Sequence, residues 1–75
     1  MVMKSQIILY IYDQLINHRV VSTNEIVERY MISIRTFRRY ISEINAFLFN
    51  NFKNQEVVYD HFKKTFMIKD TANKL

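Results

Sequence analysis

The chain has 75 residues, a formal net charge of +4, 49% hydrophobic and 15% aromatic residues, and no cysteine, glycine or proline. This length allows one domain, residues 1–75, with a small core, and the lack of cysteine excludes disulfide bonds, thiolate zinc sites and a cysteine nucleophile. The positive charge suits a polyanionic partner without requiring one. The longest apolar run, Ile7 to Tyr12, is too short to span a bilayer, and the N-terminus lacks a signal-peptide pattern, so we expect a cytoplasmic protein.

The first predicted helix covers about residues 6–17, with Ser5 as its cap. Four apolar residues recur at the spacing of one helical face and are expected to form its buried stripe: Ile8, Ile11, Tyr12 and Leu15. The polar segment 17–19 then breaks the helix.

A second, shorter helix is predicted over 23–30. Ser22 and Glu25 form an S-x-x-E capping box, in which the serine accepts the Glu25 backbone N–H and the glutamate reaches back to Ser22. Val21 and Ile26 are placed as the hydrophobic staple around this cap. Ser33, eleven residues after Ser22, repeats the arrangement, so the second helix ends in a short turn and a third helix follows at once.

The third predicted helix runs over 34–50 and has two opposed faces. Its expected core stripe comprises Ile34, Phe37, Ile41, Ile44 and Leu48. Three arginines, Arg35, Arg38 and Arg39, fall on the opposite side. One face of this helix is therefore anchored while the other is free and basic, which is the arrangement that a helix entering a DNA groove needs.

After residue 51 the apolar period changes from about 3.6 to 2, which indicates strands. Two strands are predicted at about 56–60 and 65–69, joined by a basic connection of hairpin length that contains Lys63 and Lys64. The tail, 70–75, is polar and expected to fray. The predicted fold class is mainly α with a small β-hairpin: a winged helix-turn-helix, three helices followed by a two-stranded wing.

The chain resembles the winged helix-turn-helix domains of DeoR-type and WYL-type bacterial transcriptional regulators. In those domains the sequence before the turn tends to be V-S-x-x-E, and residues 21–25 of this chain match it. After the turn the family has R-T, then an apolar residue, then R-R, and residues 35–39 match that pattern. Their wing sequence I-x-Y-D is similar to residues 57–60. The resemblance covers about residues 4–69 and implies a DNA-binding domain with double-stranded DNA as partner.

The resemblance also implies individual roles. Arg35, Thr36 and Arg39 would read bases at the start of the recognition helix. Phosphate contacts would come from the other matched positions: Ser33, Arg38, Lys63 and Lys64. The chain departs from the family at Met31, which stands where the family has a turn glycine, so the turn either takes another shape or holds Met31 in the left-handed conformation.

Two other interpretations remain open. Arginines on an exposed helix are often only a solvated face. Five aromatic residues exceed what the core can absorb: Tyr10, Phe47, Phe49, Phe52 and Phe62. These could form a homodimer interface or dock a missing C-terminal effector domain, and the alternative function is therefore a protein–protein interaction module without specific DNA binding.

Catalysis is not expected. His18 and His61 lack acids or histidines at metal-ligand spacing, and the two capping serines have no base beside them. We therefore expect neither an enzyme nor a cofactor or metal site.

Overall fold

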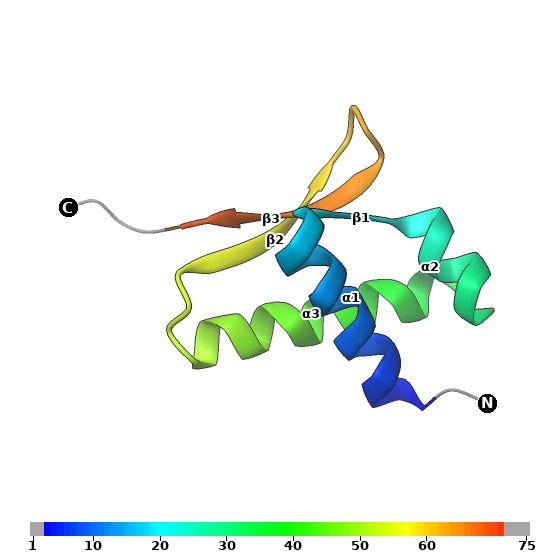
Figure 1. The fold of residues 1–75 in the computed structure, drawn as a ribbon, viewed down its shortest axis with the longest axis horizontal. Coiled ribbons are helices and arrows are strands. Elements are labelled where there is room, and N and C mark those ends of the chain that lie inside the picture. Colours follow the sequence, from blue (N-terminus) through cyan, green and yellow to red (C-terminus); the bar gives the residue numbers. More distant parts are fainter. Residues whose placement is uncertain (1–2, 72–75) are drawn as a thin grey trace.

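The computed structural model describes residues 3–71. Over this range the chain forms three helices and a three-stranded antiparallel sheet (Figure 1). In chain order the elements are α1 (Lys4–His18), β1 (Val20–Ser22), α2 (Thr23–Tyr30), α3 (Ile34–Asn50), β2 (Gln55–Asp60) and β3 (Thr65–Asp70). The predicted class of three helices with a hairpin is confirmed. Asp70, expected in the frayed tail, belongs to β3, and residues 72–75 of that tail lie outside the described residues.

The sheet has one strand more than the predicted two-stranded wing. β1 pairs with β3, with Val21 opposite Phe66, and the strand order is β1-β3-β2. The reason lies at Ser22, whose extended backbone (φ −86°, ψ 131°) is what an N-cap requires and is also strand geometry. The residues before the cap therefore form strand β1, which at three residues is too short to show the alternation of apolar and polar residues that predicts a strand.

The core is built where the three helices and the sheet meet. Phe37 is fully buried at its centre and packs edge-on against Phe66 of β3, with the ring centroids 5.4 Å apart. Its other buried members are Ile7, Ile11, Leu15, Val21, Ile26, Ile41, Ile44, Leu48, Val57 and Ile68. Burying large apolar side chains from every element holds this small domain together.

The prediction for α1 was wrong in two details. The helix begins at Lys4 with Met3 as its N-cap and no side-chain cap, so Ser5 lies inside the helix rather than before it. The buried row is Ile7, Ile11 and Leu15, whereas Ile8 and Tyr12 are only half-buried. α1 is apolar on a wide arc, and the sequence does not specify which part of that arc faces the sheet.

On α3, four of the five predicted core residues are buried, but Ile34 is 48% exposed. Ile34 is the first residue of the helix. The Ile34 side chain lies on the same helix face as the other core residues of α3. Periodicity predicts that face, but it does not predict whether the other helices and the sheet reach far enough along α3 to cover its first residue.

Within residues 3–71, five residues have positive φ, and the chain has no glycine to take such positions: Arg19, Met31, Phe52, Asn54 and Lys64. Each lies where a helix ends or a loop reverses the chain. Each such position costs roughly 1–2 kcal/mol relative to ordinary helical geometry.

Candidate nucleic-acid interface

The turn between α2 and α3 is held at both ends. Met31 closes α2 in the left-handed conformation (φ 57°, ψ 44°), which is one of the two predicted options. The Ile32 N–H donates to the Val27 carbonyl at 3.2 Å, and the backbone N–H of Thr36 donates to Ser33 Oγ at 3.0 Å. α3 therefore starts from a fixed point, as the Ser33 cap predicted.

The two serine caps are not identical. The Glu25 N–H donates to Ser22 Oγ at 3.4 Å, which confirms one half of the predicted capping box. The Glu25 carboxylate does not reach back to Ser22 but accepts from the Tyr10 hydroxyl at 3.2 Å. Ser33 makes a second contact instead, because its hydroxyl lies 3.1 Å from Thr36 Oγ1. Thr36, predicted to read a base, is thus half-buried and braced by the cap.

The three arginines of α3 are exposed on the side of the helix away from Phe37. Over residues 3–71 the ion pairs are Lys4–Glu43 at 2.9 Å and Arg19–Asp70 at 4.0 Å, and neither involves Arg35, Arg38 or Arg39. Glu43, the acid nearest to them along the helix, pairs with Lys4. The charge on this face is therefore uncompensated within the described part of the chain.

Arg29 at the end of α2 is an exposed arginine that contacts other side chains of the domain. Its guanidinium carbon lies 4.5 Å from the Tyr10 ring centroid and 5.7 Å from that of Tyr30. Partial burial and the neighbouring Glu25 carboxylate raise the pKa of the Tyr10 hydroxyl above its ordinary value. Arg29 is exposed like the arginines of α3, but its guanidinium is engaged with two aromatic rings of the domain.

Two contacts fix the hairpin relative to α3. The Asn45 side-chain amide accepts the Val57 N–H at 2.8 Å and donates to the Val57 carbonyl at 3.1 Å, so it pairs with the outer edge of β2. The Phe37–Phe66 contact joins the first half of the same helix to β3. The sequence analysis did not single out Asn45, and only its place beside the core stripe could have indicated it.

The hairpin loop stands clear of the helices (Figure 1). Asp60 organises it, because Asp60 Oδ1 accepts the N–H groups of Phe62 (2.9 Å) and Lys63 (3.2 Å), and the Asp60 carbonyl accepts that of Lys64 (2.7 Å). Lys63 and Lys64 are exposed at the tip, as predicted. Phe62 is 98% exposed beside them; the sequence analysis counted it among the surplus aromatics but gave it no role in this site.

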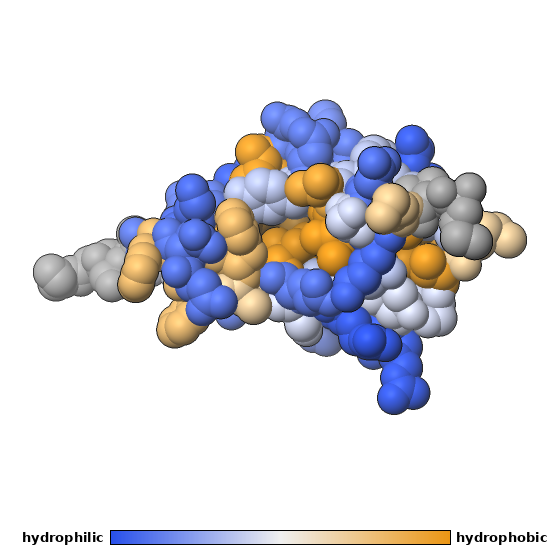
Figure 2. All heavy atoms as spheres, turned by 90° about the horizontal axis from the view of Figure 1, so that it is seen from below, coloured by the Kyte–Doolittle hydropathy of each residue, from blue (hydrophilic) through white to orange (hydrophobic). Residues whose placement is uncertain are grey.

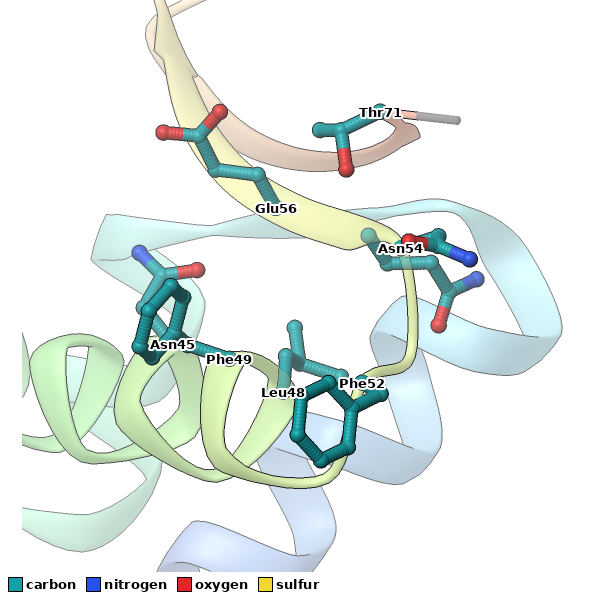
Figure 3. A pocket seen from close by; sticks show the side chains of 8 residues that line it. Asn45, Leu48, Phe49, Phe52, Asn54, Glu56 and Thr71 are labelled. Carbon is teal, nitrogen blue, oxygen red and sulfur yellow. The ribbon is translucent and has the colours of Figure 1, made fainter. Parts of the chain in front are cut away.

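A surface hollow lies at the C-terminal end of α3, away from the arginines. Figure 3 shows Phe49 and Phe52 beside it, with Glu56 and Thr71 across from them. Glu56 is the one titratable residue in its lining. Within residues 3–71 there is also no group of three or more His, Cys, Asp or Glu side chains that could hold a metal ion.

No family model matches the chain, and neither a curated protein nor a solved structure does. The resemblance to DeoR-type and WYL-type regulators therefore stays a prediction. None of the helices described has the combination of length and apolar composition that crossing a membrane needs.

Proposed function

We propose that the domain is a winged helix-turn-helix that binds duplex DNA in transcriptional regulation, with α3 in the major groove and the β2–β3 hairpin along the backbone or the minor groove. One observation carries this proposal. Three exposed arginines open a helix whose opposite face is buried, and no acid in residues 3–71 pairs with them. Such a face suits a polyanion that approaches from outside.

The roles follow from position along α3. The major groove of B-DNA is about 12 Å wide and admits one helix, whose first turns lie deepest. Arg35 and Arg39 lie one turn apart at that end, and each guanidinium can bind O6 and N7 of a guanine. Thr36 would be the third base-reading residue, and phosphate contacts would come from Ser33, Arg38, Lys63 and Lys64.

The first experiment selects bound sequences from a random duplex pool and then measures affinity for the selected site against salt concentration. Replacing Lys63 and Lys64 together by Ala should reduce the slope of log affinity against log salt by up to about 2, at roughly 0.9 per phosphate contact. Sequence preference should survive, because phosphate contacts position the domain without reading bases.

Lys69→Ala is the matched control for the hairpin. Lys69 is also exposed on β3, but it lies opposite Glu56 at the far end from the loop, so its loss should leave the slope unchanged. A wild-type protein without measurable affinity for any duplex at low salt would contradict the proposal.

A second candidate function is protein–protein interaction, and exposed apolar surface favours it. Leu9 is 63% exposed, and Phe47 is 46% exposed while it packs edge-on against Tyr12 across the α1–α3 contact. Figure 2 shows the face of the domain seen from below in Figure 1, with apolar surface in its middle and pale orange side chains toward the left, the side on which α3 ends in Figure 1. Sedimentation over a range of concentrations tests this, since a second copy that docks here would give a dimer that Leu9→Asp disrupts.

A further inference from the structure

The tip of the hairpin carries an aromatic ring that the fold does not use. Phe62 is 98% exposed, the highest value among the large apolar residues of the described range. A phenyl ring left almost entirely in water contributes nothing to the core, and burial against any apolar surface would be favourable.

The backbone that carries the ring is held in place. The backbone N–H groups of residues 62–64 all donate to Asp60, through its carboxylate or its carbonyl. Behind the tip, Tyr59 packs against His61 and Phe66 with centroid distances of 4.8 and 5.1 Å. A braced loop presents its side chain at a small cost in conformational entropy, which favours insertion into a partner.

The surroundings of the ring are cationic. Lys63 and Lys64 follow it and are exposed, while the one nearby acid, Asp60, is occupied by backbone N–H groups. An aromatic ring flanked by ammonium groups fits a surface whose apolar interior lies between two rows of anions. Stacked bases between the two phosphate backbones are such a surface.

We propose that Phe62 is a wedge that enters the minor groove of the bound duplex, inserts between two adjacent base pairs and kinks the DNA, while Lys63 and Lys64 hold the flanking phosphates. This inference rests on the proposed DNA-binding function. The wedge favours pyrimidine–purine steps, which unstack most easily, and adds sequence preference at a position that α3 does not touch. The proposal takes DNA rather than an anionic membrane as the partner, because α3 buries its apolar face in the core and cannot insert that face into a bilayer, while its arginines remain exposed.

The test uses the selected duplex with 2-aminopurine at successive positions and a donor–acceptor dye pair at its ends. At saturating wild-type protein, 2-aminopurine fluorescence should rise at one step, and energy transfer between the ends should rise because the duplex bends. Phe62→Ala should abolish both signals and lower affinity about tenfold, since one stacking contact is lost. Phe62→Leu should restore part of the bend, because an aliphatic wedge also unstacks bases.

Two matched controls separate the wedge from general effects. Phe52→Ala removes another highly exposed ring, 87% exposed, from the loop between α3 and β2. It should change neither the 2-aminopurine fluorescence nor the energy transfer. Replacing Lys63 and Lys64 by Ala should weaken binding but leave the fluorescence rise intact at saturation. Circular dichroism should confirm that each variant keeps the wild-type fold.

The outcomes are distinguishable. Duplex binding without a fluorescence rise, or with the same rise in Phe62→Ala, overturns the wedge and leaves the DNA-binding function standing. Failure of the wild type to bind any duplex at low salt overturns both. Phe62-dependent binding to phosphatidylserine–phosphatidylcholine vesicles, together with unchanged base stacking, would assign the tip to a membrane surface instead and likewise overturn the wedge.

Discussion

α2 and α3 meet at one turn and begin in the same way, yet their charges are arranged in opposite senses. α2 has Glu25 in its first turn and Arg29 in its last, which is the order that the helix dipole favours. α3 has no acid in its first turn, no base in its last, and Arg35 as its second residue. The helix dipole accounts for Glu25 and Arg29 of α2, though not for Glu28, and it does not account for Arg35 in the first turn of α3, so the arginines of α3 are better explained by a partner outside the domain.

The same contrast holds for side-chain contacts. Arg29 stacks on Tyr10, and Glu25 accepts from the Tyr10 hydroxyl, so both charges are engaged within the domain although both residues are exposed. On α3 the packed residues and the charged residues are separate sets on opposite faces. Substitutions on α3 should therefore divide cleanly into those that change stability and those that change binding.

The largest expected effect comes from the packed face. Phe37→Ala should cost about 3–5 kcal/mol of unfolding free energy, because it leaves a cavity at the centre of the core and removes the contact with Phe66. Urea denaturation followed by circular dichroism measures this, and a loss of that size would unfold most of a domain this small.

Phe49→Ala is the control on the same helix. Phe49 is 82% exposed, so its truncation should change stability by less than about 0.5 kcal/mol. A Phe37→Ala variant that melts like the wild type would overturn the phasing of α3.

The next effect comes from the charged face. Arg35→Ala and Arg39→Ala should each weaken binding to the selected site by about 1–3 kcal/mol and flatten preference at one or two base pairs. Arg38→Ala should weaken all duplexes about equally. Arg29→Ala should leave binding unchanged, since its guanidinium is already engaged with Tyr10. Binding isotherms on the selected site and on scrambled duplexes measure all four, and unchanged affinity for Arg35→Ala and Arg39→Ala would refute α3 as the recognition helix.

The start of α3 was predictable because its signals are local. Ser22 and Ser33 bond to backbone groups three residues away, and apolar residues three and four apart share a helix face, so α2 and α3 have the predicted bounds. β1 was missed because its three residues become a strand only through pairing with β3, far along the chain. The exposure of Ile34 likewise depends on tertiary structure, namely on whether the other helices and the sheet cover the first turn of α3.

The candidate site divides in the same way. The arginine face follows from helical geometry alone, so the sequence predicted it residue by residue. The anchoring of the hairpin by Asn45 depends on an amide of α3 meeting the edge of β2, and the organisation of the tip by Asp60 depends on the number of residues between paired strands. Neither feature has a periodic signal, and both decide where Lys63 and Lys64 are presented.

A smaller effect is expected at the turn itself. Met31 is 88% exposed and left-handed, so its side chain contributes little packing while its backbone is strained. Met31→Gly should therefore stabilise the domain by about 1 kcal/mol, because glycine takes positive φ without a steric penalty. The urea midpoint should rise with an unchanged denaturant slope. A lower midpoint would mean that Met31 makes contacts that its exposure does not reveal.

The smallest expected effect is the sharpest test of the comparison between the two helices. Arg35→Glu places an acid in the first turn of α3, as Glu25 is in α2, and should stabilise the free domain by about 0.3–1 kcal/mol at low ionic strength. The same variant should lose affinity for the selected duplex, because a carboxylate replaces a guanidinium at the base edge. Arg29→Glu, at the end of α2, should instead destabilise the domain and leave the DNA-facing charges intact. The stability gain of Arg35→Glu should shrink in 1 M salt, where screening reduces dipole interactions at an exposed helix end. A clear loss of stability in Arg35→Glu would mean that Arg35 serves the fold after all, and the charges of α3 would then need no external partner.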